Sequence, residues 1–161
     1  MNLKCITDWE LYNKLKKSKK IKIDDGIDDL YNIEFRMKQM LILAFCKPKI
    51  TENIYMDLYE KIYTINEKNY GLNEINFKEN WELLMYVVDC IEELGYFSTI
   101  EKFANGKVHR MWFNECGTWQ EFGNGYRGET KIETVYEAVL DFCKTYVKKF
   151  RNKIIENGGK I

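Results

Sequence analysis

Hydrophobic side chains recur every three or four positions between residues 80 and 95, and this spacing predicts an amphipathic helix. The apolar positions of the stripe are Trp81, Leu84, Met85, Val88, Ile91 and Leu94. Asn80 precedes the stripe and can accept a backbone N–H as an N-cap residue. Gly95 follows it, at the position where many helices end in a left-handed conformation. We therefore expect a helix bounded by Asn80 and Gly95.

From residue 96 the hydrophobic period changes to two, which indicates β-strands. Segments 96–103 and 107–114 flank Asn105-Gly106, a dipeptide typical of a two-residue type I′ hairpin turn. With this turn, Glu101 lies opposite Arg110, an opposite-charge cross-strand pair. One face of the hairpin then carries Tyr96, Ile100, Met111 and Phe113, and the other carries Phe97, Thr99, Phe103, Val108 and Trp112. Neither face is polar, so we expect both to be covered.

A third strand and a second helix complete this unit. The strand is expected around residues 119–122, ending at Gly123-Asn124-Gly125. Thr130 and Glu133 fit a capping box, which predicts the start of a helix. Its apolar stripe is Ile132, Val135, Val139, Phe142, Tyr146 and Phe150. We therefore expect a helix–hairpin–strand–helix unit over residues 74–151, followed by a frayed tail over residues 152–161.

The N-terminal half shows helical spacing in three segments. Thr7 and Glu10 fit a capping box that starts a short helix, and a longer helix over residues 27–46 ends before Pro48. A third helix is expected from Thr51, with an apolar face made of Ile54, Leu58, Tyr59, Ile62 and Ile65. The chain thus predicts an α+β fold. A small antiparallel sheet of about three strands is flanked by helices, and a helical region over residues 1–73 packs on the sheet.

The second unit resembles a known family. The stretches that carry the resemblance are Trp81-x-x-Leu84-Met85-x-Val87-Val88-x-x-Ile91-Glu92-x-Leu94-Gly95-Tyr96 and Thr130-Lys131-Ile132-Glu133-x-Val135-Tyr136-Glu137-Ala138-Val139. They look like the small phage and prophage proteins of the phage ABA sandwich domain, over residues of about 80–147 only. The resemblance implies a small antiparallel sheet with helices packed on it and an origin in a phage. It supplies no catalytic residue.

Composition and charge narrow the classes of function. The 161 residues carry 25 basic and 25 acidic side chains, so a globally basic nucleic-acid binder is disfavoured. No apolar run is long enough to cross a bilayer and no signal peptide is recognisable, so we expect no membrane contact and a cytoplasmic location in an infected or lysogenic bacterial host. The charges are nevertheless segregated, because residues 1–23 are strongly basic and residues 24–35 are acidic.

Catalytic and metal-binding patterns are scarce. The five cysteines contain no C-x-x-C pair, so we expect neither a disulfide scaffold nor a zinc site, but structural thiols. Phosphate-binding and nucleophile-elbow motifs are absent from the sequence. His109, the only histidine, and Cys116 could form a nucleophile–base pair if the sheet brought them together. Otherwise we expect no catalytic residue, no cofactor and no metal.

Three surfaces are candidates for binding a partner. An acidic helix face could mimic phosphates and occupy a basic channel on a partner, or could simply be solvated; it consists of Glu82, Asp89, Glu92 and Glu93. Trp119 and Tyr126, in a segment flanked by glycines, could be aromatic anchors or could cover the sheet edge. A basic segment could contact phosphates or protect an edge strand, and its lysines are Lys16, Lys17, Lys19 and Lys20.

Three hypotheses for function follow. The leading one is a non-enzymatic, phage-encoded accessory protein that binds a macromolecule and inhibits a host defence system such as a CRISPR effector. Its partner would be a host or defence-system protein, which could be part of a ribonucleoprotein. The first alternative is a nucleic-acid or nucleotide-binding module that uses the two basic termini. The second is a cryptic enzyme that uses His109 and Cys116. The sequence sets no oligomeric state.

Overall fold

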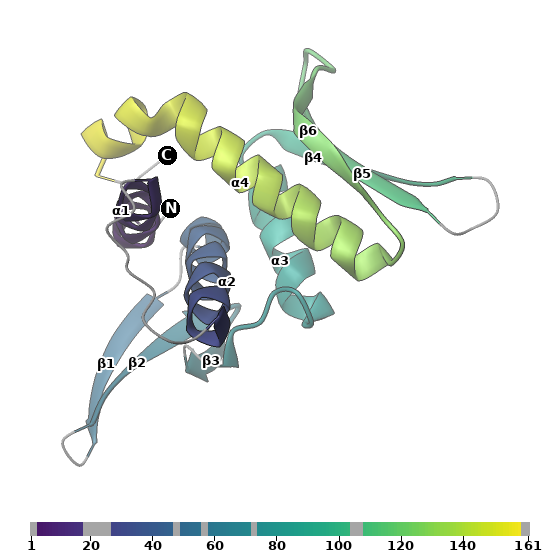
Figure 1. The fold of residues 1–161 in the computed structure, drawn as a ribbon. Coiled ribbons are helices and arrows are strands. Elements are labelled where there is room, and N and C mark those ends of the chain that lie inside the picture. Colours follow the sequence, from purple (N-terminus) through teal and green to yellow (C-terminus); the bar gives the residue numbers. More distant parts are fainter. Residues whose placement is uncertain are drawn as a thin grey trace.

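The computed structural model describes residues 3–17, 27–46, 49–55, 58–71, 74–103 and 108–158. The elements, in order, are α1 (Leu3–Lys17), α2 (Ile27–Leu43), η1 (Ala44–Cys46), β1 (Lys49–Tyr55), β2 (Leu58–Ile65), β3 (Lys68–Gly71), α3 (Trp81–Glu92), β4 (Tyr96–Lys102), β5 (His109–Glu115), β6 (Glu121–Gly128) and α4 (Lys131–Glu156). The strands that the structure describes form two antiparallel sheets, β1-β2-β3 and β4-β5-β6. Figure 1 shows α4 lying between the second sheet and the α1–α2 pair. The predicted α+β class is confirmed.

The register of the predicted hairpin is confirmed. β4 and β5 pair with Glu101 opposite Arg110. Beyond the ends of the strands, the N–H of Phe103 donates to the carbonyl of Val108 at 3.0 Å. The Asn-Gly turn itself, within residues 104–107, lies outside the described residues. The register that follows from Asn105 and Gly106 as the two loop residues is therefore the observed one, and the opposite-charge pair agrees with it.

Both predicted helix starts of this unit are confirmed. The side chain of Asn80 accepts the N–H of Leu83 at 3.1 Å at the start of α3. The hydroxyl of Thr130 accepts the N–H of Glu133 at 3.3 Å at the start of α4. Gly95, after α3, has a φ of +90°, a conformation that glycine adopts without strain. These local signals place both helices against the second sheet.

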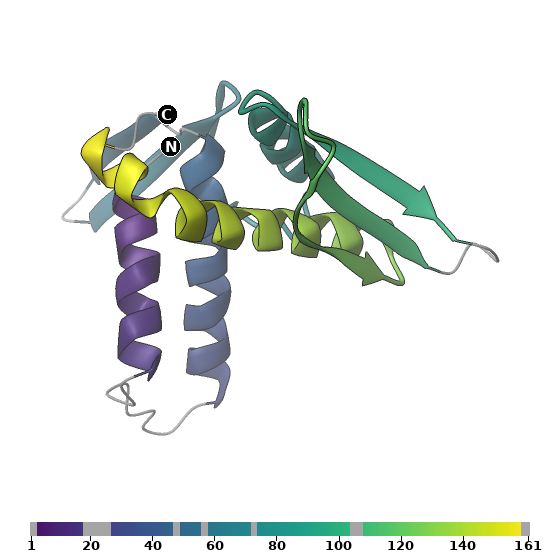
Figure 2. The ribbon, with the colours of Figure 1, turned by 90° about the horizontal axis from the view of Figure 1, so that it is seen from above.

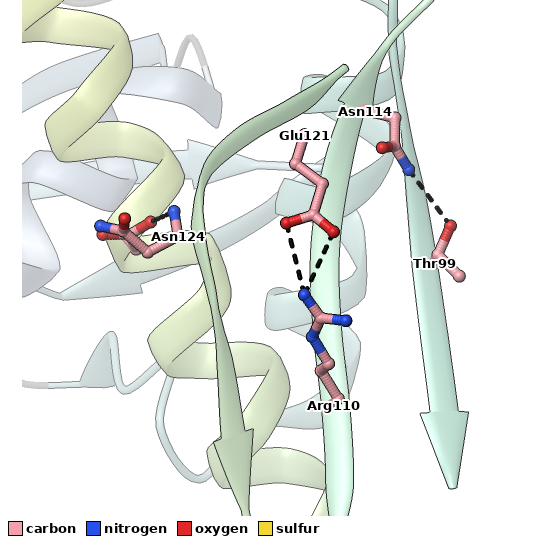
Figure 3. A network of polar contacts seen from close by, with 6 residues as sticks. Thr99, Arg110, Asn114, Glu121 and Asn124 are labelled. Atoms are coloured by element: carbon pink, nitrogen blue, oxygen red, sulfur yellow. Dashed lines mark hydrogen bonds and ion pairs between the residues drawn. The ribbon is translucent and has the colours of Figure 1, made fainter. Parts of the chain in front are cut away.

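The third strand, β6, is longer than predicted and does not end at its glycines. A register shift in the β5–β6 pairing marks a bulge, where Gly123 and Gly125 have φ values of +83° and +64°. A Cβ atom at Gly123 would lie 2.5 Å from Oδ2 of Asp141 in α4. The N–H of Asn124 donates to the same oxygen at 2.8 Å, and Figure 3 shows Asn124 beside this helix. The glycines therefore bend the strand against α4.

The helix predicted from Thr51 is wrong, so residues 1–73 are not a wholly helical region. The segment forms β1 and β2, which pair with Lys49 opposite Thr64, and β3 extends the sheet. In the second half of β2, alternate residues are buried: Tyr63 is 3% exposed and Ile65 1%. Tyr63 was not part of the predicted helical face, and the segment's β-branched and aromatic residues favour a pleated surface over a helix.

The C-terminal tail is helical further than predicted. α4 continues to Glu156, with a kink at Phe150, where φ is −112° and ψ is 15°. Ile154 lies beyond this kink and is 1% exposed within the core. Residues 152–156 are therefore part of the folded structure, because Ile154 gives the last turns an apolar anchor. The predicted frayed tail is wrong for these residues.

One core joins the two halves of the chain. The ring of Phe142 in α4 packs on Phe113 of the second sheet, with ring centroids 4.9 Å apart, and on Phe45 of η1 at 6.0 Å. Gln39 of α2 donates to the hydroxyl of Tyr136 in α4 at 3.2 Å, and both side chains are buried. α4 is therefore the element on which both halves pack.

The N-terminal helices do not cover the second sheet, contrary to expectation. Helices α1 and α2 pack on each other, on η1 and on α4, whereas α3 and α4 cover one face of β4-β5-β6. Figure 2 shows α1 and α2 running side by side across one end of α4, away from the sheet. No described element covers the opposite face of the sheet, although it carries several aromatic side chains. We call this face the outer face.

Candidate functional site on the outer face of the second sheet

The outer face consists of the side chains that point away from α4. Successive residues of a strand point to opposite faces, and the buried side chains of Met111 and Phe113 mark the inner one. The outer face therefore carries Phe97, Thr99, Glu101, Phe103, Val108, Arg110, Trp112, Asn114, Glu121 and Arg127, with Trp119 beside them. Phe103 is 40% exposed and Val108 39%. The predicted cover of this face is absent from the described part of the chain.

Trp119 is the most exposed large apolar side chain of the face, at 78%. It lies in the turn between β5 and β6, with a φ of +57°, and its N–H donates to the carbonyl of Glu115 at 3.2 Å. Its ring meets the ring of Phe97 edge to face, with centroids 5.2 Å apart. The left-handed backbone is uncommon for a bulky residue. The tight turn therefore holds an indole ring in solvent at the edge of the sheet.

Two arginines lie over aromatic rings of the same face. The guanidinium carbon of Arg110 is 4.4 Å from the centroid of the Trp112 ring, and that of Arg127 is 5.5 Å from the Phe103 ring. Nη2 of Arg110 also donates to the two carboxylate oxygens of Glu121, at 3.1 and 3.3 Å. Figure 3 shows this contact crossing from β5 to β6. Cation–π contacts and the ion pair hold the arginine head groups over the rings.

A polar pair lies among the aromatic residues. The amide of Asn114 is at 3.5 Å from the hydroxyl of Thr99, to which it donates, as Figure 3 shows. Asn114 is only 7% exposed, although it lies on the outer face. Its cross-strand neighbours there are Phe97 and Glu121. The rings and the ion pair thus surround a sheltered polar spot.

Rings and guanidinium groups suit this face to binding. Tryptophan and arginine are enriched among the residues that carry most of the binding energy at protein interfaces. The formal charge of the face is balanced, because Arg110 and Arg127 are matched by Glu101 and Glu121. An uncovered sheet face that exposes several aromatic rings and has no net charge is typical of an interaction surface.

The two predicted aromatic anchors lie on different sides of the sheet. Trp119 lies at the outer face, as described above. Tyr126 is opposite Met111 on the inner face and is partly buried against the core. The two residues are seven positions apart, an odd number, so the alternation of side chains along an extended chain already directs them to opposite faces.

All four residues of the predicted acidic helix face are exposed, but two of them have partners within the chain. Glu82 forms an ion pair with Lys68 of β3. The hydrogen bond that Lys68 donates to the Glu82 carboxylate raises the pKa of Lys68 above its usual value. Glu92 accepts hydrogen bonds from the N–H and the hydroxyl of Ser98, at 3.2 and 2.7 Å. The other two members are Asp89 and Glu93. The structure therefore explains half of this acidic face by contacts within the fold.

The predicted phosphate-binding lysines lie at the end of α1 and beyond it. Lys17 is exposed at the last position of the helix. Lys16 lies in the same turn, and Lys19 and Lys20 fall outside the described residues. The described part of this basic segment therefore projects from the end of the α1–α2 pair.

His109 and Cys116 cannot form the predicted nucleophile–base pair. His109 is the first residue of β5, and Cys116 follows its last residue. Seven steps along an extended strand separate two residues by about 23 Å. The prediction was wrong because residues in one strand are held apart by its full length. A cryptic enzyme that relies on this pair is therefore excluded.

Four of the five cysteines come close together around Cys46, which the sequence did not indicate. Burial raises the pKa of Cys46 well above its usual value, and its neighbours Cys90, Cys143 and Cys5 raise it further. Burial likewise raises the pKa of Cys143. All five cysteines are thiols, and in the described ranges no group of three or more His, Cys, Asp or Glu side chains could hold a metal ion. Buried protonated thiols of this kind are poor nucleophiles and behave as core residues.

Membrane insertion and similarity to known proteins complete the description. Among the helices that the structure describes, none has both the length and the apolar character needed to cross a bilayer. No family model, no curated protein and no solved structure matches the chain.

Proposed function

We propose that this chain is a non-enzymatic binding protein that docks on a protein partner through the outer face of the second sheet. The observation that carries the proposal is the uncovered set of aromatic rings, above all Trp119 at 78% exposure and Phe103 at 40%. Folding normally removes such rings from water, so their exposure on one continuous sheet face favours a surface that a partner covers.

The charge of the face favours a protein over a nucleic acid as its partner. Binding to a phosphate backbone depends on an excess of cations, and this face has none. The guanidinium of Arg110 is already directed to Glu121 and to the Trp112 ring. An arginine that is fixed over a tryptophan loses little conformational freedom when a partner packs on it. Aromatic and arginine side chains held in this way are typical energetic centres of protein interfaces.

In its specific form, the proposal is a phage-encoded accessory protein that acts in the bacterial cytoplasm and inhibits a host defence complex such as a CRISPR effector. The support for this form is the resemblance of residues 81–96 and 130–139 to the small phage proteins of the ABA sandwich type. An inhibitor that works by occupying a surface of its target needs a docking face and no catalytic residue. The outer face would serve this purpose.

A comparison of two tryptophan variants tests the docking face. Tagged wild-type protein, Trp119→Ala and Trp81→Ala are incubated with nuclease-treated lysate of a bacterial host, and bound proteins are identified by mass spectrometry. Trp81 is a matched control, because it is 39% exposed and lies on α3 with Lys131 over its ring. We expect one stoichiometric protein that wild type and Trp81→Ala retain and that Trp119→Ala loses by at least about tenfold in affinity. Equal retention by all three proteins would exclude the outer face.

A transformation assay tests the inhibitor form separately. Cells that carry an active CRISPR effector are transformed with a plasmid that the effector targets, with and without expression of this chain. We expect expression of wild type and Trp81→Ala to raise the transformation efficiency, and Trp119→Ala to leave it low. If wild type binds a protein in the lysate assay but protects no plasmid from any effector tried, the docking proposal stands and the CRISPR form of it fails.

A further inference from the structure

The two basic ends of the chain meet in a groove between α1 and the C-terminal half of α4. The groove has a volume of about 610 Å³. Its cationic side chains are Lys14, Lys17, Lys144, Lys148 and Arg151. Figure 2 shows α1 crossing α4 at the end that lies away from the second sheet. Residues separated by more than 120 positions in the sequence thus form one basic surface.

Most of this positive charge is not neutralised within the fold. Among the described residues that line the groove, Glu10 is the only one with a carboxylate, and it pairs with Arg151, with Nε and Oε1 2.9 Å apart. In the part of the chain that the structure describes, none of the four lysines forms an ion pair. Four like charges around one concave surface raise the local potential, and an anion that enters the groove relieves their repulsion.

The groove also has an aromatic wall. Trp9 lines it and is partly buried against the core, so its ring is held in place from behind. The amide of Asn13 donates to the carbonyl of Trp9 at 2.8 Å, within the same helix. Val147 of α4 lies across the groove. Because one side of the Trp9 ring packs on the core and the other side lines the groove, a nucleobase can stack on it.

We propose that this groove binds single-stranded nucleic acid, with the lysines at its phosphates and a base against Trp9. Lysine is a compact point charge that suits phosphates along a mobile backbone, whereas carboxylates of an acidic peptide are better matched by the planar fork of arginine. Cations combined with an aromatic side chain in one groove are the usual arrangement of single-strand binders. A stacked base requires an unpaired strand. The inference is independent of the outer face.

The test uses the full chain and a fluorescein-labelled strand of 20 deoxythymidines, with binding followed by fluorescence anisotropy at salt concentrations from 50 to 200 mM. We expect Lys144→Glu/Lys148→Glu to weaken binding at low salt at least tenfold and to reduce the slope of log affinity against log salt by about 1.4, the contribution of two phosphate contacts. Lys78→Glu/Lys102→Glu is the matched control. It makes the same change of net charge at exposed lysines outside the groove and should bind like wild type.

A second pair of variants and two competitors keep the test decisive. Lys14→Glu/Lys17→Glu alters the opposite wall of the groove and should weaken binding to a similar extent, with circular dichroism showing that both double variants fold. An abasic strand of equal length should bind at least fivefold more weakly than the thymidine strand. Equal binding by wild type and both groove variants would overturn the proposal. So would displacement of the strand by polyglutamate of equal length at equal concentration, which would assign the groove to an acidic protein segment.

Discussion

At the scale of single residues, Gly123 shows how closely the backbone of β6 approaches α4. Gly123 lies where a Cβ atom would meet the carboxylate of Asp141 at 2.5 Å, and its φ of +83° is a conformation that favours glycine. Asp141 in turn accepts the N–H of Asn124. This close approach fixes β6 on α4 and thereby orients the outer face. The close approach of β6 to α4 therefore explains the glycine at position 123. The sequence showed only that this glycine belongs to a glycine-rich segment.

Substitution of Gly123 by alanine is expected to destabilise the fold by about 2–3 kcal/mol. A left-handed conformation costs a residue with a Cβ atom about 1–2 kcal/mol, and displacement of Asp141 adds the loss of one hydrogen bond. Gly117→Ala is the control, because Gly117 has a φ of +88° but nothing within 4 Å of its Cβ position. Denaturant unfolding would measure both variants. Equal destabilisation of the two would show that the contact with Asp141 contributes nothing.

The ionisation of Tyr96 makes the free energy of unfolding depend on pH in the alkaline range. Burial raises the pKa of Tyr96 to about 12, and Tyr146 and Glu115 add to the effect. In the unfolded chain a tyrosine loses its proton near pH 10. The unfolded state therefore releases this proton first, so the stabilisation is complete below pH 10 and is lost as the pH rises to about 12. We expect Tyr96→Phe to reduce the fall in unfolding free energy across this window by up to about 1.4 kcal/mol per pH unit. An unchanged pH dependence in this variant would contradict the assignment.

Residue-scale signals in the sequence predicted part of the candidate site. Trp119 was a predicted anchor, and the Asn105-Gly106 loop predicted the hairpin register that places Arg110 and Trp112 on one face. Tyr126 was placed with Trp119 because both belong to one aromatic segment. Their spacing of seven residues puts them on opposite faces of an extended strand, which the period of two could have shown.

At the scale of elements, β4 is an edge strand, and a side chain accepts one of the backbone N–H groups on its open edge. Because Phe103 donates to Val108 across the hairpin, alternate residues of β4 direct their backbone groups to β5, and Ser98 directs its N–H to the open edge. The carboxylate of Glu92 accepts that N–H at 3.2 Å. Glu92 therefore protects an edge that could otherwise pair with another strand. Its place in the acidic helix face has a structural cause.

Removal of the Glu92 carboxylate should expose this edge. We expect Glu92→Ala to speed hydrogen exchange at the Ser98 amide and to lower the unfolding free energy by about 1 kcal/mol, the usual contribution of a hydrogen bond to a charged or neutral acceptor. Glu92→Gln keeps a side-chain oxygen in the same place and should retain most of the protection. Amide exchange measured by mass spectrometry or NMR would separate the three proteins. Equal protection of Ser98 in all three would show that Glu92 does not cap the strand.

Local sequence signals were sufficient to predict those elements whose boundaries are set by side chains within or next to them. The starts of α3 and α4 follow from the side chains of Asn80 and Thr130, and the hairpin register from alternation. Residues 51–65 were misassigned because Ile54, Leu58, Ile62 and Ile65 recur at spacings of three and four, which is the period of a helix. Strand pairing and the burial of Tyr63 and Ile65 decide between a helix and strands, and both are tertiary effects.

At the scale of the whole molecule, α4 connects two surfaces that a single sequence could not locate. A hydrophobic period indicates which residues share a face, but not whether another element packs on that face. The outer face was therefore expected to be covered by the N-terminal helices. These helices and η1 instead pack on a different side of α4, through Phe45 on Phe142 and through Gln39 on Tyr136. The same packing brings the basic termini together, so the bare sheet and the basic groove have one cause.

The separation of these two surfaces leads to a prediction for a ribonucleoprotein partner, which could offer a protein surface and a single strand together. Trp119 lies in the turn between β5 and β6, whereas Lys144 and Lys148 line the groove between α1 and α4. Substitutions at residues that neither touch each other nor share a partner have additive free-energy effects. We expect the fold-loss in affinity of Trp119→Ala/Lys144→Glu/Lys148→Glu to equal the product of the losses measured for Trp119→Ala and for Lys144→Glu/Lys148→Glu. Binding isotherms of the four proteins would measure this, and nuclease treatment of the partner should abolish only the part due to the lysines. A combined loss no larger than either separate loss would show that the two surfaces are not engaged at the same time.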